Sequence, residues 1–245
     1  MSQQKLSYKL SNLPPNIMIS PKYLLDWWDG VIARCGAKMA LQSKEPDFKL
    51  GRELWVAAVF ACCKRLVNKQ EHWVSRIADT APDAWVAYFE KDETGYGRHI
   101  YQIEVTTYGS DKSILEDVLK AKLDKAYTQD TRIVCYITKI DKTATIDPVK
   151  LEKFVSKNNP SNYEVWLLSS FEPKVSKSKD SLKLYCLTAN EDYQINLAVE
   201  KLIPNRHEAW FVPDQKATNK TGKLSLKGKL TLEYPDCSIQ WREKE

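Results

Sequence analysis

Two acidic residues stand in stretches that otherwise predict buried strands. Asp83 follows Pro82 directly before an apolar run at residues 84–90, and Glu104 lies inside a second apolar run at 99–107. An ionised carboxylate in an apolar strand is costly unless it is paired or bound to a cation. Carboxylate oxygens are the ligands that Mg²⁺ prefers, so two such acids on neighbouring strands predict a site for Mg²⁺ or Mn²⁺.

The second strand carries further polar groups on the same face as its carboxylate. Because side chains alternate along a strand, Gln102, Glu104 and Thr106 share one face. If this strand pairs with the one that begins after Asp83, both acids converge on one cation. A cation held there would polarise a phosphodiester and activate a water for attack, so the pattern favours phosphodiester hydrolysis.

Glu53 is a third acid of interest, in the first turn of an apolar helix predicted at residues 50–67. It is a candidate to join the ion or to orient the water. An acid is also favourable near a helix N-terminus for electrostatic reasons alone, so Glu53 has a structural explanation as well. Asp83 and Glu104 also have structural explanations, because Asp83 could cap a turn and Glu104 could pair with Arg98 or Arg132.

Hydrophobic periodicity predicts the elements that must position these acids. Helices are expected at residues 21–39, 50–67, 69–78, 113–127 and 147–157, and strands at 84–90, 99–107, 131–138, 163–169, 182–187, 207–212, 222–226, 228–234 and 237–241. Residues 91–98 are expected to form a loop, and 190–201 either a short helix or a strand. This order predicts an α/β fold with a mixed sheet flanked by helices. We expect the chain to divide into an N-terminal helical segment at 1–49, an α/β core at 50–172 and a β-rich C-terminal region at 173–245.

The same residues resemble those of a known family. A helix Glu, a Pro-Asp at a strand start and a Glu-x-Thr in the next apolar strand are similar to the motifs of the PD-(D/E)XK, or restriction-endonuclease-like, nuclease superfamily. The resemblance covers residues 50–169. It implies a restriction-endonuclease-like mixed sheet, with Asp83 and Glu104 as metal ligands and with Glu53 and Thr106 beside them in the catalytic site.

One position departs from the family pattern, because Thr106 stands where the motif has a lysine. The resemblance implies that this lysine positions the nucleophilic water or stabilises negative charge at the phosphate. A threonine hydroxyl can hydrogen-bond a water but carries no charge. Lys112 and Lys120, in or just before the following helix, are candidates to supply the cation instead.

The charge distribution permits a nucleic-acid partner. The net charge is +5 and the sequence pI is near 8.7, which is mildly basic and common among proteins that bind no nucleic acid. Residues 216–229 carry five lysines and no acid. They predict either a solvated hairpin whose lysines protect its edge or a surface that contacts phosphates. The candidate nucleic-acid-binding residues are Lys112, Lys120, Lys216, Lys220, Lys223 and Lys227.

Several protein classes are disfavoured. No apolar run approaches the roughly 20 residues of a membrane span, and the N-terminus lacks a hydrophobic signal core, so a cytoplasmic protein is expected. The six cysteines show no CxxC spacing and are expected to be reduced thiols. Three isolated histidines form no zinc pattern, and the GxxxxGK[ST] loop of NTPases is absent.

Three functions follow from these patterns. The first is a metal-dependent DNA endonuclease, which the resemblance connects with DNA restriction, defence or processing; cleavage of both strands would call for a homodimer. The second is a catalytically inactive nuclease-fold protein that binds nucleic acid or acts as a scaffolding subunit of a larger assembly. The third is a protein-interaction module in which the acids are structural.

Overall fold

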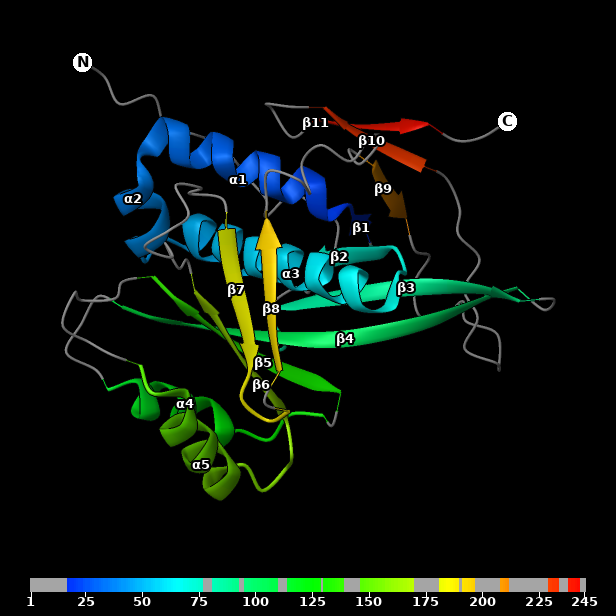
Figure 1. Ribbon diagram of the computed structural model, residues 1–245. Coiled ribbons are helices and arrows are strands. Elements are labelled where there is room, and N and C mark those ends of the chain that lie inside the picture. The colour runs from blue at the N-terminus through cyan, green and yellow to red at the C-terminus, as the bar shows by residue number, and fades with distance from the viewer. Residues whose placement is uncertain are drawn as a thin grey trace, which may run out of the picture.

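The protein has a mixed α/β architecture in which helices flank a single mixed sheet (Figure 1). The computed structural model describes residues 17–76, 81–92, 95–109, 114–128, 130–138, 146–169, 181–189, 191–196, 208–211, 229–233 and 238–242, the last three ranges by their backbone. This confirms the predicted α/β class with a mixed sheet flanked by helices.

The described part of the chain contains five helices and eleven strands. The helices are α1 (Pro21–Cys35), α2 (Ala37–Gln42), α3 (Pro46–Asn68), α4 (Leu115–Leu123) and α5 (Pro148–Asn158). The strands are β1 (Ile17–Ile19), β2 (His72–Arg76), β3 (Ala84–Asp92), β4 (Gly95–Tyr108), β5 (Thr131–Ile137), β6 (Glu164–Ser169), β7 (Ser181–Cys186), β8 (Glu191–Asn196), β9 (Glu208–Phe211), β10 (Lys229–Glu233) and β11 (Ser238–Arg242).

The described strands form one eleven-stranded sheet in the order β11-β10-β9-β1-β2-β3-β4-β5-β6-β7-β8. The pairs β4–β5 and β5–β6 are parallel, and the other described pairs are antiparallel. A parallel pair needs a crossover connection. α4 supplies it between β4 and β5, and α5 supplies it between β5 and β6.

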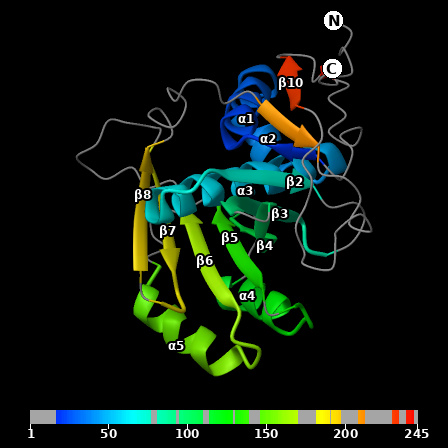
Figure 2. The same cartoon turned by 90° about the vertical axis from the view of Figure 1, so that its right-hand side faces the viewer.

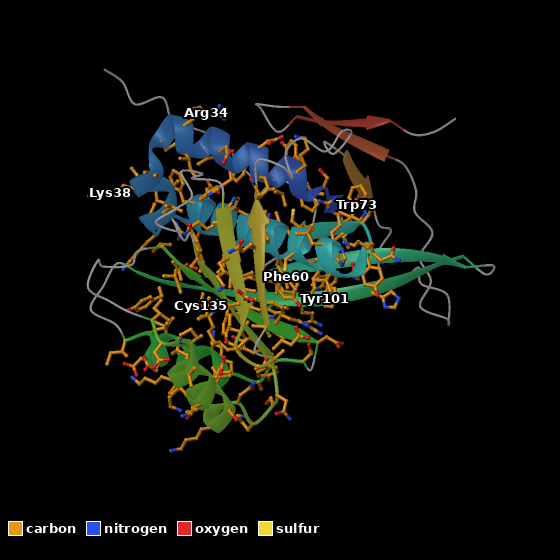
Figure 3. All side chains as sticks on the ribbon, in the orientation of Figure 1. Arg34, Lys38, Phe60, Trp73, Tyr101 and Cys135 are labelled. Atoms are coloured by element: carbon orange, nitrogen blue, oxygen red, sulfur yellow. The ribbon has the colours of Figure 1, made fainter. Side chains whose placement is uncertain are left out.

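Helix α3 is the centre of the larger core. Every residue from Gly51 to Cys63 is buried, which confirms the prediction of a helix enclosed on most sides. The helix contacts β2 and β3 in the middle of the sheet and β8 at one edge, so this half of the sheet curves around it (Figures 1 and 2). Figure 3 shows Phe60 and Tyr101 side by side where α3 meets β4; their ring centroids are 6.1 Å apart.

The close packing of α1 on α3 depends on one glycine. A Cβ atom added to Gly51 would lie 2.7 Å from a ring carbon of Trp28 and 2.9 Å from one of Trp27. Both tryptophans are buried, and their rings pack together with centroids 5.8 Å apart. A side chain at Gly51 would therefore separate the two helices.

Helices α4 and α5 cover the opposite face of the sheet (Figure 2). Leu115 and Leu119 of α4 pack there against Ile133 and Cys135 of β5, while Val134 of β5 belongs to the core around α3. This alternation confirms that the nearly all-apolar run at 131–138 is a central strand covered on both faces.

Three local predictions were wrong. The helix expected at 69–78 is strand β2, because Lys69 ends α3 in the left-handed conformation (φ 61°) and the next residues pair with β1 and β3. The helix expected at 21–39 divides into α1 and α2 at Gly36, whose φ is 82°. In the stretch expected to loop at 91–98, β3 continues to Asp92 and β4 starts at Gly95.

Two further stretches differ from or refine what was expected. Residues 17–19 form β1, where no strand was predicted, and residues 191–196 form strand β8 rather than a short helix. The strand predicted at 222–226 lies outside the described residues. Strands from all three predicted segments join the one sheet, and the segment boundaries stay a prediction.

No helix in the described part of the chain is both long and apolar enough to span a membrane.

Candidate functional site

Asp83 and Glu104 are neighbours, as the sequence predicts. Ala84 of β3 pairs with Ile103 of β4 in an antiparallel register, so Asp83 arrives beside the next residues of β4. Its Oδ2 accepts a hydrogen bond of 2.7 Å from the backbone N–H of Val105. From this point β4 continues to Tyr108 alongside β5. The two acids therefore lie at the start of β3, beside the part of β4 that extends past the β3–β4 pairing.

Glu104 is buried, with a relative exposure of 3 %, and it has charged and polar partners. Its Oε1 lies 2.5 Å from Nζ of Lys122, on α4, and accepts a 3.0 Å hydrogen bond from the hydroxyl of Tyr127. Its Oε2 is also buried, but has no hydrogen-bond partner among the described residues. One carboxylate oxygen is thus satisfied and the other remains available to a ligand.

Tyr127 is itself held in place by a second tyrosine. The hydroxyl of Tyr163 accepts a 2.7 Å hydrogen bond from the N–H of Tyr127 and donates one of 3.0 Å to its carbonyl oxygen. Burial, and then the negative charge of Glu104, raise the pKa of Tyr127 above the usual range. The phenol therefore stays protonated and acts as a donor to Glu104.

Glu53 joins the same electrostatic cluster from α3. Burial, and then the charge of Asp83, raise the pKa of Glu53 to about 7, although Lys49 at 3.4 Å opposes the shift. Burial, and then the charge of Glu104, raise the pKa of Asp83. Burial and a neighbouring carboxylate thus both disfavour the ionised forms of Glu53 and Asp83. A bound cation would favour these ionised forms.

A cavity of about 250 Å³ is lined by one of these acids, Glu53. Its lining residues come from the α2–α3 connection, from α3, from the end of β4 and from α4, and they are Lys44, Lys49, Arg52, Glu53, Val105, Thr106, Thr107 and Lys122. Thr106 therefore lines a cavity shared with Glu53 and Lys122. The geometry brings together the four predicted residues Glu53, Asp83, Glu104 and Thr106.

The structure does not place the predicted lysines beside these acids. Lys120 forms an exposed pair with Asp124 at 3.0 Å and is not among the partners of Glu104. The five others, Lys112, Lys216, Lys220, Lys223 and Lys227, lie outside the described residues and stay predictions. The structural alternative for Glu104 is not realised with Arg132, whose guanidinium instead pairs with Glu164 at 2.9 Å. The side chain of Arg98 lies outside the described residues.

Two important residues were missed, Lys122 and Tyr127. Lys122 follows Leu115 by seven residues and Leu119 by three, so helical periodicity places it on the same face as these buried leucines. That spacing could have identified Lys122 as the lysine directed at the sheet. For Tyr127 the sequence offers no comparable signal, because its position depends on the chain that follows α4.

The donor set fits a hard cation only in part. The buried Oε2 of Glu104 and the carboxylate of Asp83 are suitable oxygen ligands. Within the described residues, no group of three or more His, Cys, Asp or Glu side chains is arranged to hold one ion. A cation would therefore rest on these two carboxylates and complete its shell with water or phosphate oxygens.

Comparison with known proteins adds no relative. No family model, no curated protein and no solved structure matches this chain significantly.

Proposed function

We propose that this protein is a metal-dependent nuclease that hydrolyses phosphodiester bonds of DNA. The observation that carries the proposal is the contact between Lys122 and Glu104. Thr106 stands where the family motif has a lysine, and Lys122 brings an ammonium group to the same acid pair from α4. Further support comes from the raised pKa of Glu53 and of Asp83, which burial and then a neighbouring carboxylate cause, because a bound cation would favour their ionised forms.

The order of elements also supports a restriction-endonuclease-like fold. Helix α3 carries Glu53, Asp83 precedes β3, and β4 carries Glu104 and Thr106. The crossover helix α4 then leads to β5, which is parallel to β4. This is the order that the sequence resemblance implies: a helix acid, a strand pair with two acids, a crossover helix and a further strand.

The side chains divide the chemistry as follows. A divalent cation on Asp83 and Glu104 would supply Lewis-acid polarisation of the phosphodiester. Glu53, with a pKa of about 7, is poised to accept a proton from water near neutral pH. Lys122 places a positive charge at the wall of the cavity, where it stabilises negative charge that develops on phosphate oxygens. Thr106 lines the same cavity and can hydrogen-bond the attacking water.

The test is cleavage of plasmid DNA with Mg²⁺ or Mn²⁺, compared for the wild type, Asp83→Asn and Glu104→Gln. We expect metal-dependent nicking by the wild type and its loss in both variants. Asp117→Asn, on the exposed side of α4, is the matched control and should cleave normally. Cleavage by Asp83→Asn and Glu104→Gln at the wild-type rate would refute the assignment.

A specific observation also favours the second candidate, a nuclease-fold protein that binds nucleic acid without cutting it. Lys122 already compensates Glu104, and the described residues hold no three-ligand group for an ion. In that case the protein retains DNA in a gel-shift assay but shows no Mn²⁺ binding by calorimetry. Mn²⁺ binding that is lost in Asp83→Asn would exclude this alternative.

A further inference from the structure

We infer that the 250 Å³ cavity beside Glu53 and Lys122 is a phosphate-binding subsite whose wall includes the exposed residues Lys44 and Lys49. The inference rests on the proposed function and deepens it, because it names the substrate group that the site receives and the residues that hold it.

The charge of the cavity wall is the first argument. Four of the eight lining residues are basic, and the one acid among them is Glu53. Two of the basic residues are well enclosed: Arg52 is 8 % exposed and the side chain of Lys122 is 18 % exposed. Lys49 pairs with Glu53 and Lys122 with Glu104. Lys44 and Arg52 then leave an excess of positive charge that attracts an anion, whereas the carboxylate pair nearby attracts a cation. A phosphoryl group coordinated to a metal ion would match both the basic wall and the carboxylate pair.

The basic wall is held in position by backbone contacts. Nη1 of Arg52 donates 2.9 Å hydrogen bonds to the carbonyl oxygens of Ala40 and Ser43. These bonds fasten the end of α2 and the chain just after it onto α3. Lys44, the next residue, is thereby carried to the cavity rim. The lysines therefore reach the cavity through a fixed connection between α2 and α3.

The remaining lining suits oxygen atoms. Thr106 and Thr107 contribute the last part of β4, and Val105 is the apolar residue among the eight. Ammonium and hydroxyl donors together match the acceptor oxygens of a tetrahedral phosphate. The volume of about 250 Å³ lies below the roughly 300–1,000 Å³ of sites for drug-sized ligands. The cavity therefore suits one phosphate group rather than a whole nucleotide.

A second lysine-lined cavity provides an internal comparison. It is larger, about 1080 Å³, and its charged lining consists of Lys64, Lys153 and Lys157 with Glu152 and Glu164. Lys64 is already engaged, because its Nζ lies 4.9 Å from the ring centre of Trp166 and 3.9 Å from Glu164. Its charges nearly balance, so we do not assign an anion to it.

The test is calorimetric titration of the full-length, metal-free protein with inorganic phosphate at low ionic strength. We expect the double variant Lys44→Ala/Lys49→Ala to bind phosphate at least about tenfold more weakly than the wild type. The matched control is Lys153→Ala/Lys157→Ala, which also removes two exposed lysines but from the larger cavity. It should change the affinity by less than about twofold.

Three results would overturn the subsite. They are no measurable phosphate binding by the wild type, equal weakening in both double variants, and a loss confined to the control. The assay contains no metal, so it is separate from the test of cleavage. Phosphate binding without metal-dependent cleavage would refute the nuclease alone, and cleavage without an effect of Lys44→Ala/Lys49→Ala would refute the subsite alone.

The phosphate could come from a strand end or from within a strand. The two sources are distinguished by titrating, in EDTA, one single-stranded oligonucleotide with a 5′-phosphate and one with a 5′-hydroxyl. Stronger binding of the phosphorylated strand that disappears in Lys44→Ala/Lys49→Ala assigns a terminal phosphate. Equal binding that the same variant weakens assigns an internal diester. Oligonucleotide binding that the variant leaves unchanged contradicts the subsite.

Discussion

Nζ of Lys122 lies 2.5 Å from Oε1 of Glu104, although the two residues are 18 positions apart in the chain. The pair joins the crossover helix α4 to strand β4, and both side chains are largely enclosed. An enclosed ion pair contributes little net stability, but removal of one partner leaves an unpaired charge.

The first prediction concerns Lys122→Met. The change leaves the Glu104 carboxylate buried without its cation, so we expect the free energy of unfolding to fall by about 3 kcal/mol. If the proposed function is correct, cleavage should slow by about a hundredfold, because a positive charge at the reacting phosphate is lost. Denaturant unfolding and plasmid cleavage measure the two effects.

Two controls accompany this variant. Lys120→Met removes an exposed lysine of the same helix, whose pair with Asp124 is solvent-accessible, and should cost at most about 1 kcal/mol. The double variant Lys122→Met/Glu104→Gln removes both charges and should be more stable than Lys122→Met alone. Equal costs for Lys120→Met and Lys122→Met would show that the Lys122–Glu104 contact has no special role.

The second prediction is a pH dependence that originates in Glu53. Its pKa is raised from 4.5 to about 7, so the folded protein keeps a proton that the unfolded chain has already released between these values. The folded state binds more protons there, and the free energy of unfolding must fall as pH rises from about 4.5 to about 7. Above that range both states are ionised and the term is constant.

Glu53→Gln isolates this effect. Relative to the wild type, the variant should gain stability across the same pH window, by at most about 3 kcal/mol. Urea unfolding of both proteins at a series of pH values measures the difference. Asp83, whose pKa is raised as well, contributes with the same sign but is present in both proteins. A pH-independent difference would contradict the raised pKa of Glu53.

The third prediction has the opposite sign and comes from His72. Burial lowers its pKa from 6.5 to about 4, although the hydrogen bond between Nδ1 and the carbonyl oxygen of Gln70, at 2.7 Å, opposes the shift. Between these pH values the unfolded chain binds the extra proton, so the free energy of unfolding must fall as pH drops from about 6.5 to about 4.

NMR titration of the His72 ring should give a pKa of about 4. His72→Phe should lose the acid-side fall in stability, which for the wild type amounts to at most about 3 kcal/mol. Because the Glu53 and His72 terms run in opposite directions over much of one pH range, they partly cancel in the wild type. Each single variant keeps only one of the two terms. Plots of unfolding free energy against pH should therefore be steeper for both variants than for the wild type, and should slope in opposite directions.

The fourth prediction concerns the contact of α1 with α3. Gly51→Ala would bring a methyl group within 3 Å of both Trp27 and Trp28. Overpacking of this kind costs about 1–3 kcal/mol, which exceeds the gain of up to about 1 kcal/mol from the better helix propensity of alanine. Thermal unfolding and the near-ultraviolet circular dichroism of the tryptophans report the change. A variant more stable than the wild type would show that the helices shift apart without cost.

Much of the site could be predicted from local sequence. The apolar strands around Asp83 and Glu104 have few alternatives to burial, and alternation then places Thr106 on the face of Glu104. The buried character of α3 follows from its apolar residues on every side, and with it the enclosed position of Glu53. These features depend on neighbours in the chain, which is why periodicity reveals them.

Other features depend on pairing across the fold. Strand β2 was predicted as a helix because its five residues are too few for a period, and only their place between β1 and β3 makes them a strand. The choice of Lys122 over Lys120 depends on how α4 is rotated against the sheet. Tyr127 reaches Glu104 because Tyr163 holds its backbone.

The sequence by itself thus determined which acids must be buried, since an apolar strand or helix takes its polar members inside with it. The tertiary structure decided which cations and donors meet them. A long-range contact such as that of Glu104 with Lys122 and Tyr127 is made by crossover packing, and the burial of a lysine is favourable only once its partner is in reach. The basic cavity beside Glu53 arises in the same way, from segments that only the fold brings together.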